Sequence, residues 1–374
     1  MKNLKTTISN ALTRLSKYRL FRFVERSREK RARNMVLNEN EKLEAAPAML
    51  FDFGNEKKPR IAIVKDGILK IAYWQKFQRF CDVNKLDYEF IDSKKSNFLD
   101  FAKKFDVILW RTSSNYGELF HSKTNIYYIE KILNKIVMPN YDSLWYYEEK
   151  INQYQILKEL DLNPIKTFIS YDFDDTQEYL KTAQFPIVVK LNTSSASVGV
   201  KKIQSYHKAL RYFRKVFGNG ISFSPFGQIH QGYAYIQELT PNEGYDLRII
   251  AVGDSYFGYY RYPTPKDFRA SGSGIVVKKA IPVEALANAK RIKDMMPQSY
   301  MLAVDFLKNT ESKKFEVIET SIFIKIETCE QLMVDGVPGR YIYRNGNFIF
   351  EKGRFWLQDF IMIEVLKQYY SRAK

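Results

Sequence analysis

Residues 301–321 read MLAVDFLKNTESKKFEVIETS, two apolar runs joined by a polar turn. The runs 301–307 and 315–320 have the composition of strands, and the short turn predicts that they pair as a hairpin. Pairing residue 306 with residue 318 would place Asp305 opposite Glu319. Two carboxylates on one face of a hairpin repel each other unless something neutralises them. The stretch therefore predicts a Mg²⁺ site that bridges to phosphates, with an arginine partner for each carboxylate as the alternative.

A second informative stretch is PIVVKLNTSSASVGVKKI at 186–203. An apolar strand ends at Lys190, a loop of small polar residues follows, and a strand resumes at 201, which predicts a second hairpin. A lysine beside backbone N–H groups that small side chains leave accessible suits a phosphate. The loop lacks the Gly-x-x-x-x-Gly-Lys pattern and is not a P-loop. Taken alone, Lys190 is equally well explained as a surface lysine.

Upstream of these hairpins, strand and helix signals alternate. Strands at 61–64, 88–91 and 106–110 flank helices at 73–84 and 97–104, which predicts a small parallel α/β unit. Ligands gather at the carboxyl ends of such strands. Arg111 falls there, followed by Thr112, Ser113 and Ser114, so it is a candidate ligand residue, with a surface salt bridge as the alternative. The remaining helix signals are one at 154–160, a second that ends at residue 182, and a third at 356–370. The remaining strand signals lie at 164–169, 234–239, 247–252 and 256–262.

Composition limits the function classes. The chain has 374 residues, of which 45% are hydrophobic and 15% aromatic, and this excludes disorder as its main state. The length suggests two or three domains of about 150 residues each. Three histidines and two cysteines give neither a zinc spacing nor a disulfide framework, which is typical of a reducing compartment. No apolar run of about 18 residues and no signal-peptide pattern occurs. We therefore expect a cytoplasmic protein, or one bound peripherally at the inner face of the membrane.

The motifs follow one another in a specific order: Lys150, Lys190, a loop ending at Gly199, YIQEL at 235–239, EGYDLR at 243–248, FRAS at 268–271, and then the two carboxylates. This series resembles the ATP-grasp superfamily, and especially its carboxylate-amine ligase branch, which includes the ribosomal-protein glutamate ligase. The resemblance covers about residues 60 to 335. It implies an α/β (α+β) ATP-grasp fold. The expected divisions are a basic helical segment and connector (1–58), a pre-ATP-grasp α/β domain (59–141) and the ATP-grasp domain (142–374, with subdomains 142–233 and 234–374).

The resemblance also implies roles for the matching residues. The catalytic set would be Arg269, which holds the transferring phosphate, with Lys190 and Arg261. Arg111, Arg248 and Arg261 would bind the substrate, and Asp305, Glu319 and Ser321 fall on the three magnesium positions. The nucleotide would be contacted by phosphate-loop, hinge and ribose residues, namely Lys150, Lys190, Ser194, Ser195, Gly199, Gln237, Glu238, Leu239, Glu243, Asp246, Arg269 and Ser271.

Three departures from the family pattern alter these expectations. Ser321 stands where the third magnesium ligand is usually Asn, so either its hydroxyl or a water completes the metal shell. Serines replace glycines in the loop after Lys190, which stiffens that loop. Ile322, Phe323 and Ile324 replace a proline-glycine turn and change the wall of the acceptor site. A second register would put Glu316 on the metal but Ile318 at the third position, so Glu319 is preferred.

The implied reaction has two steps. ATP phosphorylates a carboxylate, and an amine then displaces phosphate to give an amide and ADP, with Mg²⁺ or Mn²⁺ neutralising charge. The loop 192–199 would be the lid that excludes water. An amino acid, a peptide or a cell-surface glycan precursor could be the acceptor, and a homo-oligomer is compatible. The alternatives are an ATP-grasp phosphotransferase, a nucleotide-binding regulator without turnover, and a polyanion- or membrane-surface-binding protein.

The net charge of +17 divides into two parts. Residues 1–60 hold 15 Lys and Arg against 7 Asp and Glu, and Leu4, Ile8, Leu12 and Leu15 lie on one face of a predicted helix. This helix either packs on the body or meets an anionic membrane or an acidic partner. The rest of the excess includes the lysines and arginines assigned above to a triphosphate. Nucleic acid is therefore not the expected partner.

Overall fold

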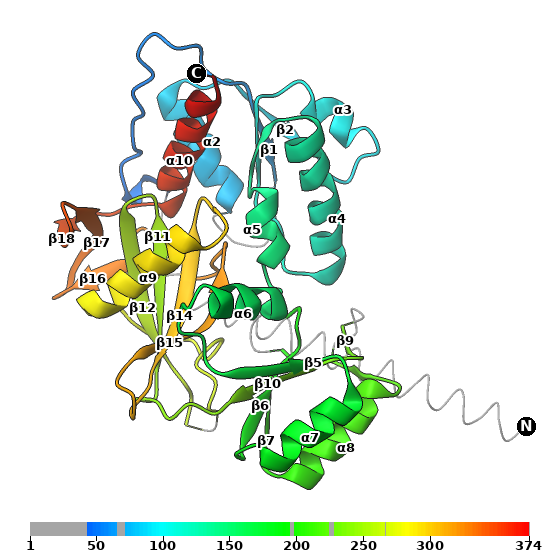
Figure 1. Cartoon of the computed structure of the whole chain (residues 1–374). Helices are drawn as coiled ribbons and strands as arrows, with labels where there is room; N and C mark the ends of the chain where they lie inside the picture. Colours follow the sequence, from blue (N-terminus) through cyan, green and yellow to red (C-terminus); the bar gives the residue numbers. More distant parts are fainter. Residues whose placement is uncertain (1–42, 66–71, 195–197, 224–227, 266, 374) are drawn as a thin grey trace, which may run out of the picture.

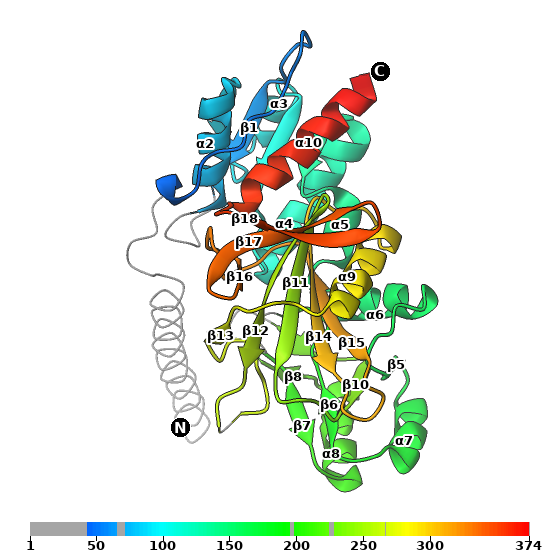
Figure 2. The same ribbon diagram turned by 90° about the vertical axis from the view of Figure 1, so that its left-hand side faces the viewer.

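The computed structural model describes residues 43–65, 72–194, 198–223, 228–265 and 267–373. The predicted N-terminal basic helix and Ser195 lie outside this part of the chain. Figure 2 shows three tiers, with a small parallel unit above a long antiparallel sheet and a further small sheet below. No helix in the described ranges is long and apolar enough to span a bilayer.

The first tier is a parallel sheet in the order β2-β1-β3-β4. The parallel arrangement and the first three strands confirm the prediction, whereas β4 was not predicted. All residues of β1 and β3 are buried, as expected for strands covered on both faces. Helix α3 is shorter than expected. The elements are β1 (Ile61–Val64), α2 (Tyr73–Asn84), β2 (Tyr88–Ile91), α3 (Phe98–Ala102), β3 (Val107–Trp110), α4 (Tyr116–Tyr127), the turn η2 (Tyr128–Ile132) and β4 (Ile136–Met138), preceded by η1 (Leu43–Ala45).

The lower tier is a four-stranded sheet in the order β5-β10-β6-β7, covered by two helices that pack on each other. Strands β6 and β7 pair antiparallel, which confirms the hairpin predicted around the loop after Lys190. The elements are β5 (Thr167–Ser170), α7 (Phe173–Thr182), β6 (Ile187–Val189), β7 (Lys201–Ile203), α8 (Tyr206–Phe217) and β10 (Ala234–Glu238), with the short pair β8 (Ile221–Ser222) and β9 (Ile229–His230) beside them.

The middle tier is antiparallel, in the order β15-β14-β11-β12-β17-β16, with β13 paired to β12 and β18 to β17. Helix α9 packs against β11, and α10 packs against α2 of the first tier (Figure 1). The elements are β11 (Asp246–Val252), β12 (Ser255–Tyr262), β13 (Ile275–Val277), α9 (Val283–Met295), β14 (Leu302–Lys308), β15 (Phe315–Ser321), β16 (Leu332–Val334), β17 (Val337–Arg344), β18 (Asn347–Lys352) and α10 (Leu357–Ala373).

Two helices, α5 (Tyr141–Tyr146) and α6 (Lys150–Glu159), connect the first tier to the lower one. Helix α6 begins at Lys150, four residues before the expected start. The N–H groups of Lys150 and Ile151 donate to the carbonyl and side-chain oxygens of Asn192, at 3.2 and 2.9 Å. The loop after β6 thus supplies acceptors to the first turn of α6, which needs them because initial N–H groups have no partner within a helix. The expected domain boundaries at 59, 142 and 234 stay a prediction.

The β14–β15 hairpin has the predicted pairing at its two carboxylates. Asp305 lies directly opposite Glu319, but Phe306 pairs with Val317 rather than with Ile318. The register expected beyond Asp305 is therefore wrong by one residue. A bulge between Asp305 and Phe306 accommodates the extra residue on β15, and a bulge of this kind changes the direction in which a neighbouring side chain points.

Candidate active site

Four charged side chains from three neighbouring strands form a buried cluster. Arg248 of β11 binds Asp305 of β14 with two hydrogen bonds, Nε to Oδ1 and Nη2 to Oδ2, both 2.6 Å. Arg261 of β12 donates from Nη2 to Asp305 Oδ2 at 2.7 Å and from Nε to Asp246 Oδ1 at 2.5 Å. The sheet register sets this arrangement, because residue 246 pairs with 261, 248 with 305, and 305 with 319. For Asp305, the arginine alternative from the sequence is what the structure shows.

The electrostatics of this cluster keep one carboxylate ionised. Burial alone raises the pKa of Asp305, but the adjacent Arg248 and Arg261 outweigh it and lower the pKa to about 2. Burial raises the pKa of Asp246 to about 6, the Arg261 charge opposes this, and the negative charge of Asp305 acts in the same direction as burial. Two carboxylates against two guanidinium groups give a nearly neutral cluster, which a buried site tolerates better than isolated charges. Asp305 therefore carries a full negative charge at physiological pH.

Beside this cluster lie the two lysines and Glu319. Lys150 Nζ donates to the Ser194 carbonyl at 2.7 Å and to the Ser194 hydroxyl at 3.3 Å, and lies 3.8 Å from Glu319 Oε2. Burial lowers the pKa of Lys190 to about 8, while the Glu319 charge acts in the opposite direction. The Glu319 side chain is 30% exposed. The structure thus brings both lysines, Ser194 and Glu319 together, as an anion site at the strand ends requires.

Glu149 holds the loop after β6, a role that the sequence analysis missed. Its Oε2 accepts from Asn192 Nδ2 at 2.6 Å and from Thr193 Oγ1 at 3.0 Å, and its Oε1 accepts from Lys123 Nζ at 2.8 Å. The sequence signal was only that Glu149 precedes Lys150. Gly199, at the other end of the loop, has φ +72°, and a Cβ there would lie 2.3 Å from Leu191 Cδ1. The close packing and the left-handed backbone both require glycine.

The expected adenine and ribose residues lie along β10 and the turn after it. Gln237 is buried and donates to Thr167 Oγ1 at 3.3 Å, and Glu238 forms an ion pair with Lys166 at 2.7 Å. The N–H of Glu238 already donates to the Lys166 carbonyl. Leu239, next along the chain, is partly buried, and Glu243 lies on an exposed turn, where its carboxylate accepts from the Tyr245 hydroxyl at 2.8 Å.

Arg269 and Ser271 lie on the loop between β12 and β13. Arg269 donates from Nε and Nη2 to the Asp267 carboxylate, at 2.9 and 2.7 Å to its nearer oxygens. The Arg269 side chain is one-third exposed. Asp267 thus neutralises Arg269, the residue that was expected to hold the transferring phosphate. The sequence analysis did not foresee Asp267 as a partner of this arginine.

Arg111 follows β3 in the first tier and is buried, so the surface salt bridge considered for it is wrong. Its guanidinium carbon lies 5.5 Å from the ring centres of both Tyr73 and Phe323. Cations favour such positions over aromatic rings. Phe323 belongs to the segment that follows Ser321, so Arg111 lies at the junction of the first and middle tiers.

Two further charged residues near this junction were missed by the sequence analysis. Glu148 has a left-handed backbone, with φ +58°, unusual for a residue with a side chain. Burial raises the pKa of Glu148 to about 7, although the positive charge of Lys150 acts in the opposite direction. Lys325 is exposed at residue level, but the groups packed around its amine desolvate it and lower its pKa. The charges of Arg111 and Arg248 act in the same direction, and that of Glu148 opposes them. Neither residue belongs to a recognisable motif, so only the fold reveals them.

The three predicted metal ligands differ in how many oxygen lone pairs they keep available for an ion. Among the described residues, no group of three or more His, Cys, Asp or Glu side chains is arranged to hold an ion. Mg²⁺ in proteins is commonly held by one or two carboxylates, with phosphates and water completing the shell. Glu319 fits this role because its side chain is partly exposed. Asp305 fits because its Oδ1 accepts one hydrogen bond and keeps a lone pair for an ion. The Ser321 hydroxyl donates to the Phe323 carbonyl at 2.7 Å and accepts from the Phe323 N–H at 3.4 Å, which leaves one oxygen lone pair for an ion, so its role as the third ligand stays a prediction.

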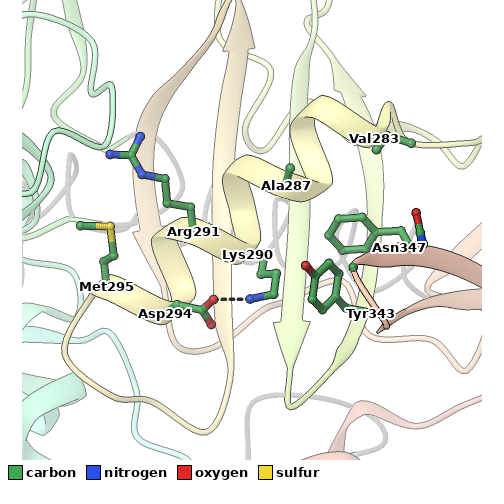
Figure 3. Close-up of a pocket in the computed structure, with 10 residues that line it drawn as sticks. Val283, Ala287, Lys290, Arg291, Asp294, Met295, Tyr343 and Asn347 are labelled. Carbon is green, nitrogen blue, oxygen red and sulfur yellow. Dashed lines mark hydrogen bonds and ion pairs between the residues drawn. The ribbon is translucent and has the colours of Figure 1, made fainter.

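A separate pocket lies between α9 and the β17–β18 hairpin (Figure 3). Its volume is about 560 Å³, and Lys290, Arg291, Asp294 and Tyr343 are among its lining residues. None of the residues predicted from the sequence lines it. Lys290 and Asp294 form an ion pair at 2.5 Å within it. The pocket is therefore distinct from the strand-end cluster.

Comparison with known proteins identifies the class. The sequence model of the RimK-like ATP-grasp domain matches residues 147–336, just over half of the chain. The chain belongs to the RimK-like ATP-grasp family, and the resemblance found in the sequence is confirmed.

Three individual proteins are similar to this chain. The alpha-aminoadipate–LysW ligase LysX of Saccharolobus solfataricus is 25% identical over 196 residues, which cover 50% of this chain and 66% of that protein, just under two thirds. The structure of D-cycloserine synthetase DcsG has a TM-score of 0.58 with 11% identity, covering 82% of this chain and 99% of that one. D-alanine–D-alanine ligase from Bacillus anthracis, complexed with ATP, has a TM-score of 0.54 with 15% identity over 84% and 99%. These structural likenesses confirm the ATP-grasp fold.

Proposed function

We propose that this protein is an ATP-dependent carboxylate-amine ligase that releases ADP and phosphate. The observation that carries the proposal is the gathering of Lys150, Lys190 and Glu319 beside the Asp305 cluster, in a chain of the RimK-like ATP-grasp family. The fold shared with an ATP-bound ligase supports ATP as the nucleotide. The names of the similar proteins, all ligases or synthetases, support amide formation.

The nucleotide would lie between the lower and middle tiers. Lys190 and Lys150 would bind its phosphates, and the anions would keep the Lys190 amine protonated despite its lowered pKa. Leu239 and the Glu238 carbonyl would contact the adenine edge. The loop 192–199, held by Glu149 at one end, would cover the phosphates and exclude water.

Asp305 and Glu319 would hold Mg²⁺ with phosphate oxygens. The ion, when bound, would neutralise charge on the phosphates. Either the Ser321 oxygen, whose hydroxyl already donates to the backbone, or a water would complete the shell. Arg261 and Arg248 would fix the orientation of Asp305, and Arg269 would leave Asp267 to bind the transferring phosphate.

The reaction would proceed by two displacements. A substrate carboxylate oxygen attacks the γ-phosphorus, the bond from that phosphorus to the β–γ bridging oxygen breaks, and ADP leaves. The amine nitrogen then attacks the acyl carbon, phosphate leaves with the carbon–oxygen electron pair, and the amine loses a proton. The cations of the site lower the barrier by neutralising the charge that builds up on oxygen.

The acid would bind near Arg111, Lys325 and Arg248, whose positive charges converge at the junction of two tiers. An acid with an anionic group besides the reacting carboxylate suits this set of cations, whose charge Asp305 and Glu148 offset in part. Amino acids are the first candidates, because the names of similar proteins contain alpha-aminoadipate and D-alanine. A peptide or an acidic glycan precursor is the next class to examine. Residues 1–58 would meet an anionic surface or an acidic partner.

The test is ADP release with ATP, Mg²⁺ and a matrix of acids and amines, beginning with alpha-aminoadipate, L-glutamate and D-alanine. The proposal expects release that requires both an acid and an amine. Lys190→Met should weaken ATP binding by about tenfold or more, because a buried phosphate-binding charge is lost. Lys181→Met is the control, since Lys181 lies on α7 and pairs with Glu178 on the surface. ADP release without any amine would contradict the ligase proposal.

A nucleotide-binding regulator is the second candidate. One observation favours it: both Asp305 oxygens accept hydrogen bonds from arginines, which leaves few lone pairs on that carboxylate for a metal. ATP binding that depends on Lys190, without turnover in any acid and amine mixture, would support this candidate over the ligase.

A further inference from the structure

A buried ion pair joins helix α2 to Glu327, which lies at the end of segment 322–327 after Ser321. Lys76 of α2 donates to Glu327 Oε2, and the two side chains are only 1% and 3% exposed. Gln358 Nε2 of α10 donates to the same oxygen at 3.0 Å. Lys76 Nζ also lies 4.6 Å from the centre of the Trp356 ring. Two helices distant in sequence therefore hold one carboxylate.

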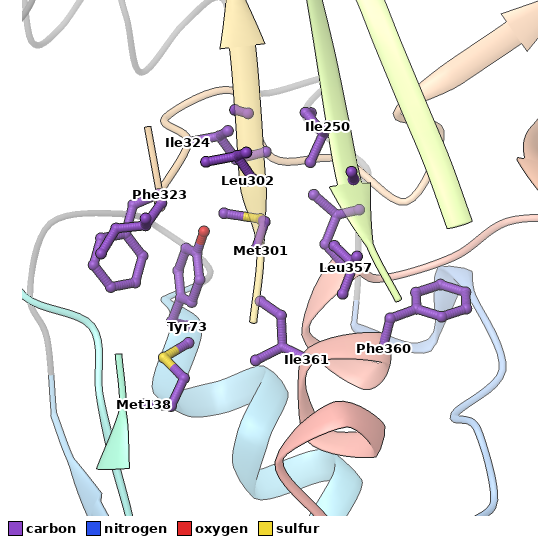
Figure 4. Packing of buried hydrophobic residues seen from close by; sticks show 14 of the residues in the cluster. Tyr73, Met138, Ile250, Met301, Leu302, Phe323, Ile324, Leu357, Phe360 and Ile361 are labelled. Carbon is purple, nitrogen blue, oxygen red and sulfur yellow. The ribbon is translucent and has the colours of Figure 1, made fainter. Parts of the chain in front are cut away.

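The segment 322–327 is buried at both ends, while Lys325 between them is exposed. Ile322, Phe323 and Ile324 are 3%, 4% and 1% exposed. The Phe323 ring meets Tyr73 of α2 edge-on, with centroids 5.7 Å apart, and meets Tyr147 at 5.4 Å. Figure 4 shows Tyr73 beside Phe323, with α2 and α10 below them. The segment is thus fixed by apolar packing at one end and by Glu327 at the other.

Residues on this segment face the side of the site proposed to bind the acid. Phe323 lies under the Arg111 guanidinium, and Lys325 lies between Phe323 and Glu327 in the chain, where Arg111, Arg248 and Glu148 act on its charge. A movement of Glu327 would therefore displace Lys325, only two residues away. Misplacing a binding group by about 1 Å is enough to change rates strongly.

A buried ion pair is poorly suited to raising stability. Removing two charges from water costs about as much free energy as their attraction returns, so such pairs are better explained by the geometry that they impose. The run 322–324 contains no proline or glycine, and the path of the segment that it begins is set by contacts with α2 and α10.

We propose that Lys76 and Glu327 are positioning residues, whose buried ion pair fixes segment 322–327 so that Phe323 and Lys325 face the acid. The proposal rests on the ligase function proposed above for this site. Neither residue touches the nucleotide or the reacting atoms in this assignment. Their loss should therefore act on acid recognition rather than on ATP binding.

The experiment compares Lys76→Met with a matched control, Arg79→Met. Both residues lie on α2, and both form ion pairs with acidic side chains that are almost fully buried. Arg79 binds Asp359 of α10 at 2.6 Å and the carbonyls of Leu43 and Ala46. Its contacts are therefore with α10 and with the chain that precedes β1, not with segment 322–327. Each variant loses one charge and leaves one carboxylate buried. Glu327→Gln, which keeps the shape of the side chain, is the second variant if Lys76→Met fails to fold.

Two measurements separate positioning from stability. Hydrogen–deuterium exchange in protein without substrates should be faster at 322–331 in Lys76→Met and unchanged there in Arg79→Met. With the best acid and amine pair from the ADP assay, Lys76→Met should raise the KM of the acid by about tenfold and that of ATP by less than about twofold. Glu327→Gln should shift the acid KM in the same direction by less. Equal effects of the two methionine variants on the acid KM and on exchange would overturn the proposal.

The outcomes also separate this inference from the ligase proposal. If the unaltered protein gives no ADP with any acid and amine, the ligase function fails, while the exchange comparison still reports whether the pair fixes the segment. If the protein is active and exchange at 322–331 is the same in both variants, the ligase function holds and the positioning role is wrong.

Discussion

At the scale of single residues, Asp305 determines how the site is organised. Its carboxylate accepts three hydrogen bonds of 2.6 to 2.7 Å from two arginines. The hairpin pattern was enough to predict that Asp305 faces Glu319. The binding of both arginines to Asp305 could not be predicted, because it depends on β11 lying between β14 and β12. That strand order is a long-range property that spacing along the chain does not encode.

Asp305→Asn is expected to abolish turnover and to weaken folding. The amide keeps the shape but removes the charge, so two buried guanidinium groups face Asp246 alone. We expect a loss of rate of about 10²-fold or more and a loss in the free energy of unfolding of about 3 kcal/mol. ADP release and urea unfolding measure the two effects. Asp294→Asn, at an exposed ion pair on α9, should change neither, and full activity of Asp305→Asn would refute the metal assignment.

A second prediction at this scale concerns His230. Its ring is buried, with Nδ1 2.8 Å from the Tyr212 hydroxyl and Nε2 2.9 Å from the Tyr233 carbonyl. Burial lowers the pKa of His230 from 6.5 to about 4. The unfolded chain therefore binds this proton first, and the stability present above pH 6.5 is lost as the pH falls towards 4.

Between pH 7 and pH 4, the protein should lose about 3 kcal/mol more of its unfolding free energy than His230→Gln does. Denaturant unfolding at a series of pH values measures this difference, and the comparison cancels the other titrating groups. Parallel pH profiles for the two proteins would show that the pKa of His230 is the same in the folded and the unfolded protein.

At the scale of elements, the loop after β6 and the start of α6 depend on each other. Asn192 accepts from the first N–H groups of α6, while Glu149 accepts from Asn192 and Thr193. The β6–β7 hairpin was predictable because its apolar runs and small-residue loop are local signals. The start of α6 was not, because its capping partner lies more than forty residues away.

Glu149→Ala should therefore loosen the loop that would cover the phosphates. We expect the KM for ATP to rise about five- to tenfold, since two charge-assisted hydrogen bonds to the loop are lost. Lys123→Met is the matched control, because Lys123 binds the other oxygen of the same carboxylate. Equal ATP affinity in Glu149→Ala and the unaltered protein would show that this anchor does not shape the nucleotide site.

At the scale of the whole molecule, aromatic side chains contribute to the junction of the first and middle tiers. The parallel unit and the long hairpin were predictable, since each arises from local periodicity. Helices α4, α5, α8 and α9 and strands β4, β8, β9, β13 and β16 to β18 were not anticipated. The junction itself was not predictable either, because it brings α2, α10 and segment 322–327 together from the two ends of the described chain.

Phe323 lies at this junction, against Tyr73 of the first tier and Tyr147 of the connector. Replacing it with Ala removes a large buried side chain and leaves a cavity between tiers. The expected loss in the free energy of unfolding is about 3 to 5 kcal/mol. Phe101→Ala, on α3 with its side chain 39% exposed, should cost much less. Because Phe323 joins two tiers, the variant should also split a single urea transition into two; one unchanged transition would show that the tiers fold as a unit without this contact.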